Sequence, residues 1–132
     1  MNIRPILSFH NSYQLISPIS FKMNITSSSI QTSGLRLSIK KDNLEIAHTF
    51  LYFLHNDLHV QPLAYLEDVF VDEEFRGQGY GRKIVKRAIT EAKRAHCYKM
   101  VATSRFSNET AQSLYISCGF EKHSHGFRIN LT

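Results

Sequence analysis

Residues 68–82 read DVFVDEEFRGQGYGR, and this stretch decides the fold that we predict for the chain. It opens with aromatic and β-branched residues, which are typical of a buried strand. It ends in a turn with three glycines, and residues 81–95 continue with the apolar spacing of an amphipathic helix. Glycines let the backbone approach a ligand closely, and free N–H groups at a helix N-terminus favour phosphate. The sequence therefore predicts a strand, a phosphate-binding turn and a helix.

The spacing of the glycines excludes two common phosphate motifs. A P-loop requires Lys and then Ser or Thr after its last glycine, whereas Gly81 is followed by Arg82 and Lys83. A dinucleotide fingerprint requires a glycine three residues after Gly79, and Arg82 occupies that position. A glycine-rich turn that binds no ligand is the alternative, and the turn alone does not decide between the two.

The residues on either side of this stretch predict helices packed on a mixed sheet. Aromatic and β-branched runs at 44–54 and 64–71 predict two long, mostly buried strands, separated by a loop that contains Pro62. Further strands are expected at 97–104 and within 120–131. Between them, Asn108 and Gly119 are suited to the two ends of a helix. The order strand, strand, helix, strand, helix, strand predicts an α/β fold.

The first 41 residues differ from the rest, since they are rich in Ser, Ile and Asn and keep no helical period. They predict an atypical N-terminal part made of strands and a loop. The strands are expected at 6–9, 13–21 and 35–39, and the Ser-rich loop at 22–34.

Length and composition predict one globular domain over residues 1–132. The net charge of +5 suits a polyanionic partner, which includes a phosphorylated cofactor. The N-terminus lacks a signal-like apolar segment, and the apolar stretch at 46–54 is too short to span a bilayer, so we expect a cytoplasmic protein without membrane contact. The basic helix lacks the interleaved aromatic residues of a nucleic-acid module. No third ligand accompanies His123 and His125, so no metal site is expected.

Two separated motifs resemble those of the GNAT N-acetyltransferase superfamily. The first is Arg76-x-x-Gly79-x-Gly81 after a strand, which is similar to the acetyl-coenzyme A motif. The second contains Asn108, Ala111, Leu114-Tyr115 and Cys118-Gly119-Phe120, in a family where an Asn opens the fourth helix and Gly-Phe follows it. The resemblance covers about residues 44–131. It implies a GNAT-like, mostly antiparallel mixed sheet flanked by helices, and acetyl transfer from acetyl-coenzyme A to an amine.

The resemblance also implies roles for the matching residues. The strand before the turn is expected to hold the pantetheine arm through its backbone, and the amides of the turn to hold the pyrophosphate. Tyr115 corresponds to the general acid that protonates the departing thiolate, with core packing as the alternative. The implied cofactor-binding residues are Val69, Phe70, Val71, Arg76, Gly77, Gln78, Gly79, Tyr80, Gly81, Arg82, Asn108 and Tyr115.

Two adjacent carboxylates, Glu67 and Asp68, lie in a strand otherwise suited to burial. Alternation predicts that they point to opposite faces. The segment 66–69 is similar to one in glucosamine-6-phosphate N-acetyltransferases, where the glutamate lies at the acceptor amine. This implies that Glu67 orients the amine or relays its proton through water, and it makes both residues candidates for substrate binding. A structural ion pair is the alternative for each.

The acceptor side departs from the family pattern. Members usually carry two helices between their first and second strands, and residues 10–34 show none. The sequence therefore does not identify the acceptor amine, and an amino-sugar phosphate is one candidate. We expect either the loop at 22–34 or a second copy in a homodimer to cover the exposed side. A non-catalytic acyl-coenzyme A-binding regulatory domain is the alternative function, although a sensor needs neither Tyr115 nor Glu67.

Overall fold

The computed structural model describes residues 9–10, 14–15 and 18–132, and it divides the chain into two compact units, 1–30 and 31–132. In the first unit, β1 (Phe9–His10) pairs antiparallel with β2 (Gln14–Leu15). Residues 18–30 are exposed and form no helix or strand. Of the strands predicted at 6–9 and 13–21, residue 9 lies in β1, residues 14 and 15 form β2, and residues 18–21 are in no strand; residues 6–8, 13, 16 and 17 lie outside the described residues. That residues 1–132 form a single domain stays a prediction.

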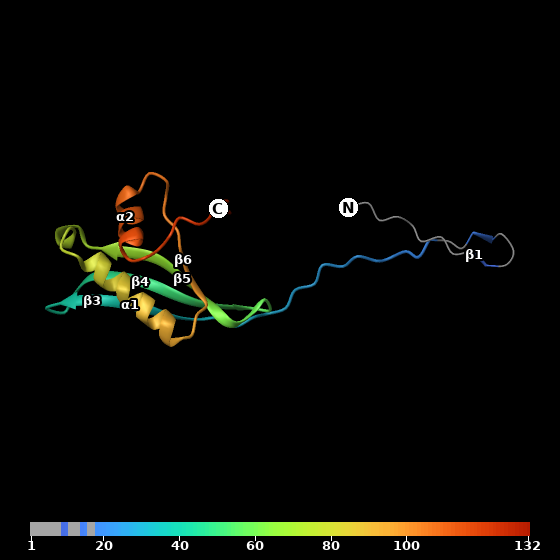
Figure 1. Cartoon of the computed structure of the whole chain (residues 1–132), viewed down its shortest axis with the longest axis horizontal. Helices are drawn as coiled ribbons and strands as arrows, with labels where there is room; N and C mark the ends of the chain where they lie inside the picture. Colours follow the sequence, from blue (N-terminus) through green and yellow to red (C-terminus); the bar gives the residue numbers. More distant parts are fainter. Residues whose placement is uncertain (1–8, 11–13, 16–17) are drawn as a thin grey trace. The chain divides into compact units, whose positions relative to one another are not determined.

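The second unit contains a four-stranded mixed sheet (Figure 1). Neighbouring strands pair antiparallel except for the last two, which are parallel. This arrangement confirms the predicted α/β fold with a mixed, mostly antiparallel sheet. In spatial order the strands are β3 (Ser33–Lys41), β4 (Leu44–Asn56), β5 (His59–Val71) and β6 (Lys99–Ala102).

Two helices follow the strands as the sequence predicts. A short 3₁₀ turn, η1 (Glu73–Phe75), and α1 (Tyr80–Arg94) connect β5 to β6, and α2 (Glu109–Ser117) follows β6. The side chain of Asn108 accepts a hydrogen bond from the N–H of Ala111 at 3.0 Å and caps α2. Gly119 lies after its end with φ of 98°, a left-handed conformation that favours glycine.

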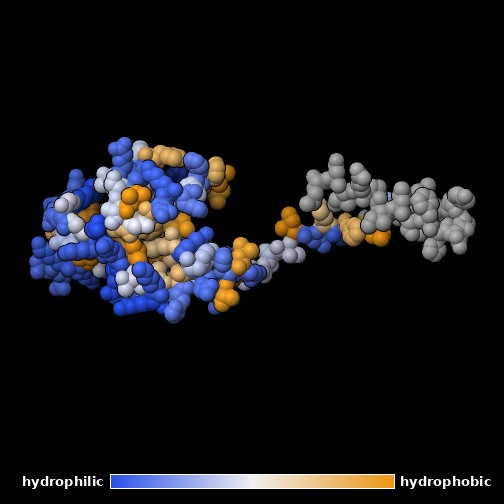
Figure 2. Space-filling model, in the orientation of Figure 1, coloured by the Kyte–Doolittle hydropathy of each residue, from blue (hydrophilic) through white to orange (hydrophobic). Residues whose placement is uncertain are grey.

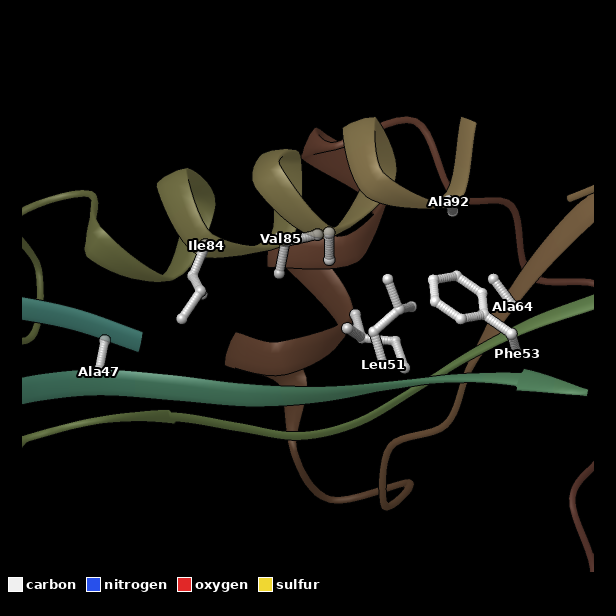
Figure 3. Packing of buried hydrophobic residues seen from close by; sticks show 9 residues of the cluster. Ala47, Leu51, Phe53, Ala64, Ile84, Val85 and Ala92 are labelled. Carbon is white, nitrogen blue, oxygen red and sulfur yellow. The ribbon is translucent and has the colours of Figure 1, made fainter. Parts of the chain in front are cut away.

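The core lies between α1 and one face of the sheet (Figure 3). Alternate residues of β4 point towards the helix, and the ladder sets Leu51 opposite Leu66 and Phe53 opposite Ala64. Burying each large aliphatic side chain stabilises the fold by about 1.5–3 kcal/mol. The buried residues of this cluster are Ala47, Leu51, Phe53, Ala64, Leu66, Ile84, Val85, Ala88 and Ala92.

The opposite side of the sheet, which we call the open face, is not covered by α1. Its rings are partly accessible, and Tyr52 and Phe70 are 37% and 39% exposed. Among the described residues no α-helix precedes α1, and β3 passes to β4 through a tight turn at Asp42 and Asn43. The open face carries Arg36, His48, Phe50, Tyr52, Tyr65, Glu67 and Phe70.

The loop predicted around Pro62 is wrong, because β5 starts at His59 and includes this proline. The hairpin turns tightly, and the N–H of Leu58 donates to the side chain of Asn56 at 2.9 Å. Pro62 is tolerated because it lies at a register shift in the β4–β5 ladder, where no ladder donor is required. Its carbonyl accepts from the N–H of Tyr98 at 3.0 Å.

The final strands predicted within 120–131 are also wrong, since all these residues are described and none is in a strand. The strand at 97–104 shortens to β6, which pairs with Leu63 to Leu66 of β5. Phe127, Ile129 and Leu131 alternate in the sequence, yet they are exposed and have no neighbouring strand in the described part of the chain. A local pattern stabilises a strand only when a partner supplies its hydrogen bonds.

Candidate active site

The turn between β5 and α1 is shaped by local hydrogen bonds. The carboxylate of Asp72 accepts from the N–H of Glu74 at 3.1 Å and caps η1. Arg76 folds back, and its Nε donates to the carbonyl of Val71 at 3.0 Å. Gly77 and Gly79 have φ of 73° and 85°, which glycine adopts without the strain that a side chain would cause. The glycines therefore provide the backbone conformation that the turn requires.

The amides at the start of α1 are available to an anion. Gly79 is the N-cap and supplies no side-chain cap, and the first N–H groups of a helix lack intrahelical acceptors. The helix dipole adds about half a positive charge there. A Cβ on Gly79 would meet no atom within 4 Å, so space lies in front of these amides, and Arg76 and Arg82 are exposed beside them. These residues fit a pyrophosphate.

The side chains of the turn leave this space open. Gln78 is held by a hydrogen bond from its Nε2 to the carbonyl of Glu74 at 3.2 Å. Tyr80 packs edge-on against Phe75, with ring centres 6.2 Å apart. Both side chains therefore make contacts within the turn and helix. If Gln78 and Tyr80 bind an anion as predicted, they do so through their backbone N–H groups.

The edge of β5 next to the turn is unpaired where the pantetheine arm is predicted. Among the described residues, β6 pairs with β5 only as far as Leu66, so residues 67–71 have no strand neighbour on that side. Val69 and Val71 pack against the core, and Phe70 lies on the open face. The side chains of these residues are thus used in packing, while their backbone borders free space.

Tyr115 lines a cavity of about 460 Å³ formed by β6, α2 and residues 120–126. Its ring packs against Phe120 with centroids 5.4 Å apart. Burial raises the pKa of the Tyr115 phenol, and nearby Tyr65 raises it further. The side chain is therefore a neutral proton donor around pH 7. The glycine turn and Glu67 do not line this cavity, although Leu114 next to Tyr115 contacts the first turn of α1.

A β-bulge at Asp68 changes the direction of the carboxylates in β5. Phe50 lies opposite Glu67 and His48 opposite Phe70, so Asp68 and Val69 together oppose a single residue of β4. Asp68 has φ of 52°, in the left-handed region. The prediction that Glu67 and Asp68 point to opposite faces is wrong, because the extra residue brings both side chains to the open face.

Asp68 belongs to a charged network that the sequence analysis missed. Its Oδ2 lies 3.0 Å from Nε2 of His48, and Nδ1 of His48 lies 3.1 Å from Oε1 of Glu45. Arg36 donates to both oxygens of Glu45 at 2.7 and 2.6 Å, and this hydrogen bond is the main cause that lowers the pKa of Glu45 to about 2. Glu45 is therefore an anion at any pH near neutrality.

The two candidate acidic residues differ in their surroundings. Oδ2 of Asp68 lies 3.0 Å from Nε2 of His48, so this carboxylate has a side-chain partner. Glu67 is exposed, and within the described part of the chain its carboxylate makes no ion pair. Its carbonyl accepts a hydrogen bond from Oγ1 of the buried Thr49 at 2.9 Å. Glu67 thus has a carboxylate free to meet an acceptor and a backbone fixed to β4.

Residues 9–10, 14–15 and 18–132 contain no group of three or more His, Cys, Asp and Glu side chains placed to hold a metal ion. In the same residues, no helix combines the length and apolar character that crossing a bilayer requires.

Comparison with known proteins agrees with this architecture. The profile of the acetyltransferase (GNAT) family matches residues 29–120. A probable glucosamine 6-phosphate N-acetyltransferase 2 of Oryza sativa is 36% identical over 58 residues, which are 44% of this chain and 33% of the rice protein. The human N-alpha-acetyltransferase 30 is 26% identical over 130 residues, covering 79% of this chain and 36% of the human one.

A solved structure has the same fold. The putative acetyltransferase from Agrobacterium tumefaciens superposes with a TM-score of 0.70 at 31% identity, over 74% of this chain and 68% of that protein. The chain spans about a third of the length of the rice and human relatives. Because the family profile covers most of the sheet, the glycine turn and both helices, the chain belongs to the acetyltransferase (GNAT) family.

Proposed function

We propose that this chain transfers an acetyl group from acetyl-coenzyme A to a primary amine. The observation that carries the proposal is the glycine turn, whose uncapped amides open onto free space at the N-terminus of α1. Beside it, the unpaired edge at residues 67–71 offers backbone groups to an extended pantetheine arm. The net charge of +5 also suits a cosubstrate that carries several phosphates.

The proposed reaction is direct attack of the amine on the thioester carbonyl. A tetrahedral oxyanion forms, a backbone N–H near Val69 or Phe70 stabilises it, and the C–S bond then breaks. Tyr115 donates its proton to the departing thiolate, because a raised pKa keeps the phenol neutral. The amine loses its proton to solvent, through a water held by Glu67. Asn108, whose oxygen caps α2, has its amide nitrogen left for the cosubstrate.

The acceptor is proposed to approach the open face near Glu67. The relatives named above act, by their names, on an amino-sugar phosphate and on a protein N-terminus, and both present a primary amine. On this face the carboxylates of Glu67 and Asp68 and the rings of Phe50 and Phe70 lie on neighbouring positions. We therefore propose a small-molecule or peptide amine, with the amino-sugar phosphate as one candidate.

A cytoplasmic homodimer is part of the proposal. Two surfaces can be covered by a second copy: the partly exposed rings on the open face, and the outer edge of β3, which has no partner strand among the described residues. Figure 2 shows hydrophobic side chains exposed in the middle of the unit formed by residues 31–132, and others along the segment before β3. Burying such surface favours self-association.

An acceptor screen that follows the release of free coenzyme A tests the function. The protein is incubated with acetyl-coenzyme A and amino-sugar phosphates, peptides or aminoglycosides, with acetyl-coenzyme A alone as the hydrolysis control. Amine-dependent release and an acetylated product are expected. Tight binding of acetyl-coenzyme A without release for any amine would instead support the regulatory domain, and absence of binding would reject both functions.

A further inference from the structure

We propose that His48 is a positioning residue for acetyl transfer, because it holds Asp68 in the bulge of β5 and so fixes the backbone that receives the thioester. The inference rests on the proposed function, and it names a residue to which neither the motifs nor the relatives direct attention. Its basis is the row of contacts that joins three strands on the open face.

The bulge needs a restraint because Asp68 has an unfavourable backbone conformation. A φ of 52° places it in the left-handed region, where residues other than glycine are uncommon. Aspartate enters this region more often than most residues with a side chain, but extended and helical angles are still its commoner conformations. The contact between its carboxylate and Nε2 of His48, at 3.0 Å, ties the side chain to β4 while the backbone keeps this conformation.

His48 is itself held on three sides. Nδ1 meets the carboxylate of Glu45 at 3.1 Å, and the ring stacks on Phe70 with centroids 5.0 Å apart and planes at 22°. Glu45 is fixed in turn by the paired hydrogen bonds from Arg36 on β3. A doubly protonated imidazole donates to both carboxylates, whereas the neutral ring donates to one. The row Arg36, Glu45, His48 and Asp68 therefore links the edge strand to the bulge.

The position of the bulge matters because the residues that follow it are those proposed to hold the thioester. Val69 comes directly after Asp68, and Phe70 both follows it and stacks on His48. If Asp68 relaxed to an extended conformation, the backbone amides of these residues would move. A displacement of 1 Å at a reacting centre lowers rates by as much as about 100-fold.

Two other roles for His48 give different expectations. As a general base or proton relay, His48 would be needed whatever residue occupies position 68. As a purely structural residue, it would change stability without changing the rate at saturating substrates. A positioning role predicts instead that the need for His48 disappears when position 68 adopts the left-handed conformation by itself, as glycine does.

A double-mutant cycle separates these roles. His48→Phe keeps a ring for stacking on Phe70 and removes both hydrogen bonds, and Asp68→Gly removes the backbone strain. His48→Phe is expected to lower kcat about tenfold in the wild-type background and less than twofold in the D68G background. His59→Phe is the matched control, because His59 also stacks on an aromatic ring, that of Tyr98 with centroids 3.9 Å apart, but at the start of β5 and away from Asp68; it should leave kcat unchanged.

Amide hydrogen exchange of residues 67–71 supplies a readout independent of turnover. His48→Phe should accelerate exchange in this segment, and adding Asp68→Gly should restore protection. An equal loss of kcat from His48→Phe in both backgrounds, or no loss in either, overturns the inference. If the wild type releases no coenzyme A with any amine, the proposed function fails, and unchanged exchange in His48→Phe would then reject the role of His48 separately.

Discussion

Gly81 in the first turn of α1 lies directly against Leu114 of α2: a Cβ at Gly81 would be 3.2 Å from Cδ2 of Leu114 and 3.7 Å from Cγ2 of Val71. The two sequence motifs, separated by more than two dozen residues, are thus in contact. A Cβ at this position would be closer than an ordinary contact, so the Leu114 side chain would have to shift by a few tenths of an ångström to admit it. Through this contact, the turn that is proposed to bind phosphate lies next to α2, the helix that carries Tyr115.

Gly81→Val should therefore destabilise the protein and disturb the site. The added methyl groups would overpack the contact with Leu114, which typically costs about 1–3 kcal/mol. We expect a lower urea midpoint and weaker binding of acetyl-coenzyme A by calorimetry. The double variant with Leu114→Ala should recover part of the stability. If Gly81→Val folds and binds as the wild type does, the contact is not a constraint on the site.

Gly79 is predicted to be essential for the cosubstrate and much less so for the fold. Acetyl-coenzyme A should raise the Tm of the wild type, because a ligand that binds only the folded state stabilises it. Gly79→Leu should abolish this rise, since its side chain would occupy the space before the amides. The left-handed φ adds a cost of roughly 1–2 kcal/mol to the apo protein.

Gly119→Leu is the control for Gly79, because a Cβ there also meets no atom within 4 Å and its φ of 98° is likewise left-handed. It should keep the rise in Tm. Stronger binding of NAD or ATP than of acetyl-coenzyme A to the wild type would contradict the assignment of the glycine turn.

Tyr115→Phe tests the general acid. The substitution keeps the ring against Phe120 and removes the proton, so kcat should fall about 100-fold with little change in cosubstrate affinity. Because burial raises the pKa of Tyr115, the phenol stays protonated at neutral pH. Ionisation of Tyr115 should therefore not reduce the wild-type rate at any pH below about 10. Steady-state kinetics over pH 6–10 measure both effects. Tyr98→Phe is the matched control, and equal turnover in Tyr115→Phe would leave Tyr115 as packing.

The lowered pKa of Glu45 should make the free energy of unfolding depend on pH in the acid range. Its pKa is about 2 in the folded protein and about 4.3 in an unfolded chain, so the unfolded state binds more protons between these values. The stabilisation is present above the unfolded pKa and is lost as the pH falls through the folded one. The urea midpoint of the wild type should therefore drop more between pH 5 and pH 2.5 than that of Glu45→Gln. Exposed Glu121→Gln serves as the control and should follow the wild type.

The homodimer can be tested by light scattering at micromolar concentration. The expected mass is twice that of the 15.2 kDa chain, and activity should fall on dilution if the second copy helps to form the acceptor site. Tyr52→Lys on the open face should weaken the dimer by introducing a charge into buried surface. A monomer that keeps full activity on dilution would exclude the dimer as the cover of this face.

The sequence predicted the elements whose signals are local. The aromatic and β-branched run of β4, the helical spacing of α1 and the glycine turn each depend on residues close together in the chain. The cap of α2 by Asn108 was predictable for the same reason. These features define the sheet, the helices and the turn that is proposed to bind the cosubstrate.

The charged network could not be predicted because it depends on two bulges. Glu45 and His48 are three residues apart and would lie on opposite faces of a regular strand, but a register shift next to Ile46 brings them together. The second bulge does the same for Asp68. A bulge is set by the pairing of two strands, so neither strand alone indicates it. The sequence contains one partial indication of the network: His48, Phe50 and Tyr52 occupy alternate positions of β4 and so share one face of the sheet.

The short length of β6 has a consequence for solubility. Since β6 stops opposite Leu66, the remainder of β5 presents a free edge, and free edges are templates on which other chains add strands and aggregate. The kink at Asp68 and the negative charges of residues 67 and 68 make this edge a poor template. The irregularity that shapes the proposed reaction site is therefore also expected to protect the chain from fibril-like growth.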